Sequence, residues 1–139
     1  MYYKNEFLKI MEEQKEMAVA TSVDNIPNVR VLNFFYDNVK HTLYFATFKD
    51  NHLTKEISKN NLVSITTIPA KTRKHVRIIK GYVHRSKLSI FDVKDMFIKK
   101  APEHEEIIEY RKDDFYVYEV DFSEAIVTID FISSKIILA

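Results

Sequence analysis

The segment IPNVRVLNFFYDNVKHTLYFATF, residues 26–48, contains two β-rich runs separated by a polar stretch. Val, Phe, Tyr and Thr dominate both runs, as they do in pleated strands, and Asp37-Asn38 between them is typical of a tight turn. A similar run, Met17–Val23, comes just before and ends at the turn-like Asp24-Asn25-Ile26-Pro27. We therefore predict three consecutive antiparallel strands, at Met17–Val23, Asn28–Tyr36 and His41–Phe48.

Short β-rich runs continue through the rest of the chain, with few helices between them. Further strands are predicted at Leu62–Ile68, Val76–Arg85, Phe115–Phe122 and Ile126–Phe131, and helices over residues 3–16, 51–60, 89–99 and 103–110. So few helical crossovers disfavour a parallel sheet and favour a closed barrel. We expect a mainly β fold with peripheral α-helices, in a single domain over residues 1–139.

Composition excludes several classes of site. The chain has no Cys, which removes disulfides and thiolate metal sites, and its net charge of +1 gives no field for nucleic acid or membranes. It has one glycine, Gly81, so a glycine-rich phosphate loop cannot be built. A bound nucleotide would therefore have its phosphate held by side chains and a helix N-terminus.

The N-terminal residues favour a cytoplasmic protein. Residues 1–16 are charged throughout and lack the apolar run of a signal peptide. No apolar stretch approaches the roughly 20 residues that a membrane span needs. We therefore expect no membrane contact.

The order of these elements resembles a known family. Pro27-Asn28-Val29-Arg30-Val31-Leu32-Asn33-Phe34, then Leu43-Tyr44-Phe45-Ala46-Thr47, then Val76-Arg77-Ile78-Ile79-Lys80-Gly81, follow the pattern of the pyridoxamine 5′-phosphate oxidase-like split-barrel family. The resemblance spans roughly residues 3–87 and continues more loosely to Phe122. It implies a six-stranded antiparallel split β-barrel of Greek-key type, with short flanking helices.

The resemblance also implies an FMN-binding homodimer with the flavin between subunits. The second strand would lie beside the isoalloxazine, and the end of the third strand and the start of the next helix would hold the phosphate. Arg30, on the second strand, would add a bidentate contact to that phosphate. The predicted cofactor-binding residues are Arg30, Val31, Leu32, Asn33, Thr47, Asn51, His52 and Lys55. A strand edge suits the donor–acceptor pattern of a flavin, and a helix N-terminus suits a phosphate.

Two departures from the family pattern stand out. Leu53 occupies the position where the family usually carries Lys or Arg, and the nearest basic residues are His52 and Lys55. The residues after Asp121 do not resemble the Arg-containing tail of true pyridoxamine-phosphate oxidases. We therefore expect an altered phosphate site and a substrate other than vitamin B6.

Three functions remain open at this point. The first is an FMN-dependent oxidoreductase that takes electrons from a reduced nicotinamide and acts on an unknown small molecule, with unidentified catalytic residues. The second is a non-catalytic flavin- or tetrapyrrole-binding module. The third is a nucleic-acid-binding barrel that uses the basic residues between Lys71 and Lys80. The five His residues show no paired metal-ligand spacing, so we expect no metal site.

Overall fold

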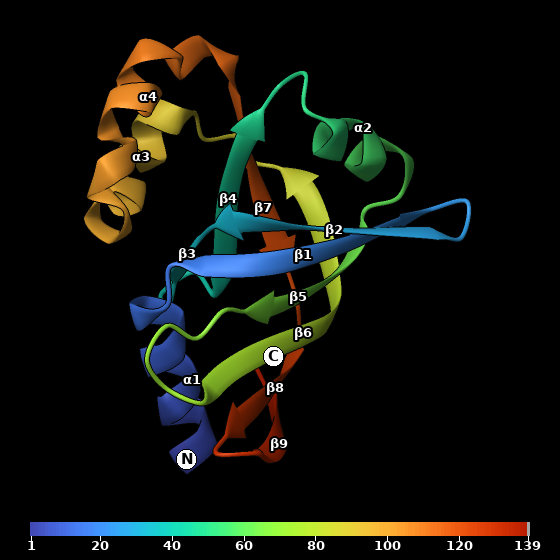
Figure 1. Cartoon of the computed structure of the whole chain (residues 1–139), viewed down its shortest axis with the longest axis vertical. Coiled ribbons are helices and arrows are strands. Elements are labelled where there is room, and N and C mark those ends of the chain that lie inside the picture. The colour runs from blue at the N-terminus through green and yellow to red at the C-terminus, as the bar shows by residue number, and fades with distance from the viewer. Residues whose placement is uncertain (139) are drawn as a thin grey trace.

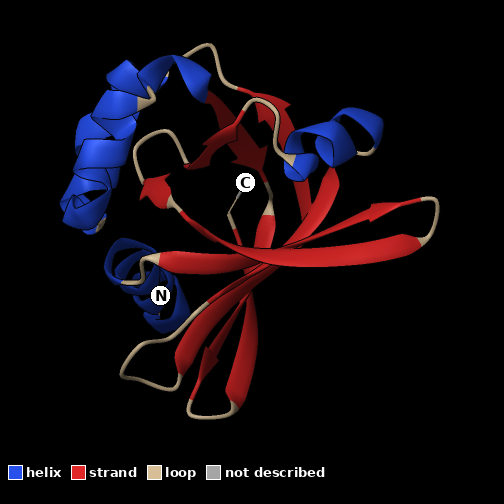
Figure 2. Ribbon diagram, turned by 45° about the horizontal axis from the view of Figure 1, so that its top comes forward, coloured by secondary structure: helices blue, strands red, loops and turns tan. Residues whose placement is uncertain are grey.

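The computed structural model describes residues 1–138, and its strands join one antiparallel sheet that curls into a barrel (Figures 1 and 2). The elements are, in chain order, α1 (Tyr2–Glu13), β1 (Glu16–Val23), β2 (Ile26–Asn33), β3 (Phe35–Asp37), β4 (Thr42–Phe48), α2 (His52–Lys59), β5 (Leu62–Thr67), β6 (Lys74–Arg85), α3 (Ile90–Lys100), a 3₁₀ turn (Pro102–His104), α4 (Glu105–Tyr110), a second 3₁₀ turn (Lys112–Asp114), β7 (Phe115–Asp121), β8 (Glu124–Ile129) and β9 (Ile132–Ile137).

The barrel is closed by the chain itself. The strand order is β2-β1-β5-β6-β7-β4-β3, so β2 and β3 lie at opposite ends of the path although only Phe34 separates them in the sequence. The Phe34 side chain is fully buried, and its N–H donates to the Lys15 carbonyl at 3.2 Å. β8 and β9 extend the sheet beside the first half of β6.

The helices cover the barrel at three places (Figure 1). α1 packs Phe7 and Ile10 into the main core at one end, and α2 packs Leu53 and Ile57 into it at the other. α3 and α4 lie outside, over β3, β4 and β7, where Phe97 belongs to a second core cluster. None of the described helices has the length and apolar character that crossing a membrane requires.

The predicted antiparallel barrel is confirmed, but the predicted number of six strands is wrong: the sheet has nine. The predicted strand Asn28–Tyr36 is divided at Phe34, where the chain passes from one edge of the sheet to the other. β9 was not predicted, because the turn before it is made by Asp130 and Phe131 at φ 49° and 73°. Phe rarely adopts positive φ, so no turn signal marks this hairpin.

The predicted helix starts are confirmed by their caps. The Asn51 side chain accepts from the Leu53 N–H at 3.1 Å and begins α2. Ser89 and Asp92 form a reciprocal capping box that begins α3.

Gly81 is required by space. A Cβ at this position would lie 2.9 Å from Cγ1 of Val120 and 3.2 Å from Cγ2 of Val63, and both valines are buried. The β5–β6 register also shifts between Val63 and Ile65, so Gly81 lies beside both a bulge and a close approach, as its place inside a strand predicts.

Substitution Gly81→Ala should therefore destabilise the fold by about 1–3 kcal/mol through overpacking. Urea unfolding measures this, with Val120→Ala and the double variant completing a cycle. Removing Cγ1 of Val120 should relieve part of the clash, so the double variant should lose less than the sum of the single losses. Strict additivity would contradict the proposed contact.

Candidate functional site

A groove lies where β2 leaves the barrel, between that strand and the α3–α4 helices. Three predicted site residues, Val31, Leu32 and Asn33, form one wall of it. Its volume is about 250 Å³, and the other lining residues are Ala46, Phe48, Ile90, Phe97, His104, Ile107, Ile108 and Phe115. The groove is therefore mainly apolar, with the Asn33 amide and the His104 imidazole as its polar side chains.

The wall formed by β2 also offers backbone groups. Within residues 1–138, β2 pairs only with β1, so its other edge is not used in a ladder. Val29 and Val31 are more than half exposed on this strand. An edge of this kind presents alternating N–H and C=O groups to a planar polar ring.

The Arg30 side chain lies on the face of β2 opposite Val29 and Val31, and it points toward α2. Its guanidinium forms an ion pair with Glu56 and donates to Thr21 Oγ1 at 2.9 Å. Burial opposes ionisation of Glu56, but hydrogen bonds from Asn28, Arg30 and Thr21 and the charge of Arg30 outweigh it and lower the pKa of Glu56. The charge of the predicted phosphate ligand Arg30 is thus already balanced by a carboxylate.

The other predicted phosphate residues do not line the groove. Thr47 is buried on β4 opposite Tyr116, and Asn51 is engaged as the cap of α2. His52 and Lys55 are exposed on the first turn of that helix. Leu53, at the family's cation position, is 1% exposed and belongs to the core. The structure thus brings Val31, Leu32 and Asn33 together in the groove, while Arg30 is ion-paired and residue 53 is an apolar core residue.

The helical wall of the groove was missed at the sequence level. Ile90 and Phe97 follow helical spacing and Ile108 lies in the next predicted helix, which indicates only an apolar face. His104 was considered only as a metal ligand and has no second His at helical spacing. The only available signal was Pro102, which ends α3 and turns the chain back so that α4 packs against α3.

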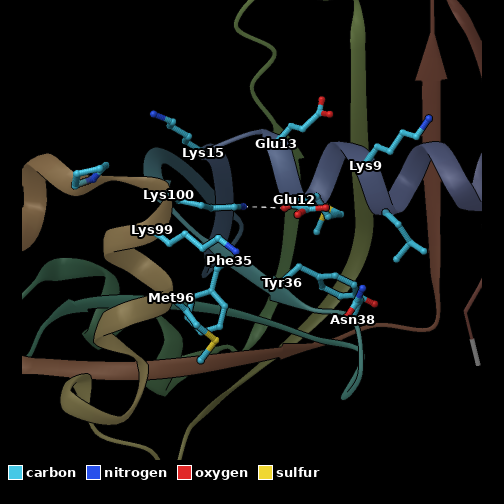
Figure 3. Close-up of a pocket in the computed structure, with 13 residues that line it drawn as sticks. Lys9, Glu12, Glu13, Lys15, Phe35, Tyr36, Asn38, Met96, Lys99 and Lys100 are labelled. Atoms are coloured by element: carbon cyan, nitrogen blue, oxygen red, sulfur yellow. Dashed lines mark hydrogen bonds between the residues drawn. The ribbon is translucent and has the colours of Figure 1, made fainter.

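A larger cavity, of about 570 Å³, lies elsewhere, between α1 and α3 (Figure 3). Lys100 from α3 reaches across to α1, where its Nζ donates to the Met11 and Gln14 carbonyls at 2.7 and 2.8 Å. Burial lowers the pKa of Lys100 to about 8, against the charge of Glu12, which raises it. Because this amine is occupied in capping α1, and no predicted site residue lines the cavity, we assign the functional site to the smaller groove.

The chain thus combines an antiparallel barrel with an apolar groove beside an edge strand. The model of the pyridoxamine 5′-phosphate oxidase-like family matches residues 10–133. The chain belongs to this family, which confirms the resemblance noted in the sequence.

Solved structures support the same fold at low sequence identity. A Clostridium acetobutylicum protein related to general stress protein 26, of the pyridoxinephosphate oxidase family, has 12% identity and a TM-score of 0.75, over 99% of this chain and 95% of that one. A FAD-binding protein from Mesorhizobium loti has 15% identity and a TM-score of 0.64, over 88% and 89%. HutZ, the haem storage protein from Vibrio cholerae, has 18% identity and a TM-score of 0.66, over 88% and 91%. A search of curated proteins found no match.

The ion pair of Glu56 gives a pH-dependent prediction. Because the pKa of Glu56 is lowered from its ordinary value of 4.5, the carboxylate stabilises the fold above that value, and this contribution is lost as pH falls through the lower folded pKa. Glu56→Gln should cost about 1–2 kcal/mol at neutral pH, since the pair is partly solvent-screened.

Urea unfolding of both proteins at about pH 7 and about pH 3 measures the difference, which should shrink at the lower pH. Glu103→Gln, at an exposed carboxylate, is the control. A cost that is independent of pH would contradict the assigned ion pair.

Proposed function

We propose that the groove binds the isoalloxazine of FMN and that the protein is a flavin-dependent oxidoreductase. The observation that carries this proposal is the position of Val31, Leu32 and Asn33, three adjacent residues of an edge strand that form one wall of an apolar groove. Membership of the pyridoxamine 5′-phosphate oxidase-like family supports it. So does the similarity to a FAD-binding protein of the same fold.

The groove residues fit the ring part of the cofactor. The β2 edge offers N–H and C=O groups at the regular spacing of a strand, which suits the polar side of a flavin. Phe48, Phe97 and Ile108 cover the opposite side with apolar surface and exclude water. A bound flavin supplies hydride and electron transfer, so the chain itself needs no nucleophile.

Polar side chains at the groove have distinct roles in this proposal. Asn33 is placed to exchange hydrogen bonds with a bound ring, since its amide both donates and accepts. His104 is partly buried in the wall formed by the 3₁₀ turn and α4. In this proposal a reduced nicotinamide supplies electrons and a small organic molecule receives them.

We propose further that a second copy of the chain completes the site. A volume of about 250 Å³ is below the roughly 300–1,000 Å³ of typical ligand pockets, which supports a site that a second copy completes. The outer face of the sheet also exposes apolar side chains on β2 and β6: Val29 is 63%, Ile79 55% and Tyr82 51% exposed. Such a face is typical of a surface that another chain covers.

A second candidate function is haem binding without catalysis. His104 lines the groove, and His is a common axial ligand of haem iron. The haem storage protein HutZ has the same fold. Addition of hemin in place of FMN separates the candidates, because a haem site at His104 would give a Soret shift that His104→Ala abolishes.

Filling the groove should weaken flavin binding. Ala46→Leu places a larger side chain against the groove and should raise the Kd for FMN by at least about tenfold, which corresponds to about 1.4 kcal/mol. Quenching of flavin fluorescence measures the affinity. Ala70→Leu, in an exposed loop, is the matched control and should bind normally. Unchanged affinity in a folded Ala46→Leu protein would exclude this groove.

The assembly proposal predicts a dimer by light scattering. Val29→Lys places a charge on the exposed sheet face and should shift the protein to monomer, because a buried unpaired charge is costly. Val39→Lys makes the same change in the exposed β3–β4 turn, where Val39 is 84% exposed, and should leave the dimer intact. A monomeric wild-type protein would contradict the proposed interface.

A further inference from the structure

A second, basic pocket adjoins the groove. It has a volume of about 310 Å³ and is formed by the segment from Arg85 to Phe91, the end of β4, and the residues around the start of β7. Its charged lining residues are Lys49, Arg85, Lys87, Lys112 and Asp113. Four cations therefore face one carboxylate, which gives the basic pocket a formal charge of +3.

The cations of the basic pocket are not neutralised by acidic partners. Within residues 1–138, none of Lys49, Arg85, Lys87 and Lys112 takes part in an ion pair. Three of them lie over aromatic rings instead: Arg85 is 3.5 Å and Lys49 5.4 Å from the centroid of Tyr116, and Lys112 is 5.2 Å from that of Phe91. Cation–π contacts orient a cation but leave its charge available.

The basic pocket and the groove share part of their walls. Ile90 and Phe115 line both. At the end of β4 two adjacent residues line different spaces: Phe48 lines the groove, and Lys49, just after the strand, lines the basic pocket. Phe48 also stacks on Phe115 at 4.7 Å between ring centroids. A ligand with an apolar ring and an anionic arm therefore meets both environments side by side.

The position where the family usually binds the phosphate has fewer available cations in this chain. There, Arg30 is paired with Glu56, whose carboxylate would repel a phosphate, and Leu53 is buried in the core. A phosphate carries nearly two negative charges and needs uncommitted donors. At that position only the exposed His52 and Lys55 remain, whereas four cations are gathered at the basic pocket.

We propose that the basic pocket binds the phosphate group of FMN, in place of the position around Arg30 and residue 53. The inference rests on the proposed flavin function, because it assigns the second half of the same site. Lys49 and Lys112 act as point charges, and Arg85, whose Cζ lies 3.5 Å from the Tyr116 ring centroid, offers a planar set of N–H donors.

Affinities for FMN and riboflavin test the proposal, because the two ligands share the ring system and differ in the phosphate. Fluorescence quenching gives both Kd values for the full chain. Lys49→Ala and Lys112→Ala should each raise the Kd for FMN about tenfold, the loss of one charge-assisted contact, and leave riboflavin binding unchanged. Lys99→Ala removes the same charge at the distant α1–α3 cavity and should change neither Kd.

Glu56→Gln provides the opposing test. If Arg30 held the phosphate, removing the competing carboxylate would tighten FMN binding relative to riboflavin, and that result would overturn the proposal. Equal binding of the two flavins by the wild-type protein would also overturn it. If the wild-type protein binds both flavins and the lysine variants bind FMN as tightly as it does, only the placement of the phosphate is rejected. If the wild-type protein binds neither FMN nor riboflavin, the proposed flavin function is rejected as well.

Discussion

The closure of the barrel at Phe34 is the constraint on which the rest of the structure depends. One residue joins the two ends of the sheet path, so its ring must be buried where β2 and β3 part. The Lys15 carbonyl fixes its N–H, and the Lys100 ammonium lies 3.9 Å from its ring centroid while also bonding α1. Because β2 ends here without joining a second strand, its last residues are left to form the wall of the groove.

Charge is distributed around the proposed site in a way that net charge conceals. Between β2 and α2, Arg30 and Glu56 cancel each other. At the basic pocket, four cations surround a small space with one carboxylate, although the whole chain carries only +1. Local imbalance of this kind, next to apolar surface, is what a ligand with a ring and an anionic group recognises. The two halves of the proposed site thus differ in chemistry as the two halves of a flavin nucleotide do.

The barrel could be predicted because strand alternation and turn residues are local signals, and Asn51 and Ser89 mark helix starts in the same local way. The crossing of the chain at Phe34 and the turn at Phe131 could not be predicted. Burial of Phe34 at a crossing and positive φ at Phe131 leave no pattern in the sequence. The prediction that residues 31–33 bind a cofactor came from the family resemblance. The pairing of Arg30 with Glu56 joins residues on different elements, and Phe97 has the spacing of any core residue. These parts of the site depend on tertiary contacts and become visible only in the folded chain.

The free edge of β2 has a consequence for solution behaviour. Unpaired backbone groups that suit a planar ligand also suit a strand from another molecule, and such edges are templates for edge-to-edge association. Pro27 lacks an N–H and interrupts this template near the β1–β2 turn, while residues 29–33 contain no proline. A ligand bound in the proposed site would therefore shield the segment most open to strand addition, and we expect the ligand-free protein to be the form more prone to aggregate during storage or concentration.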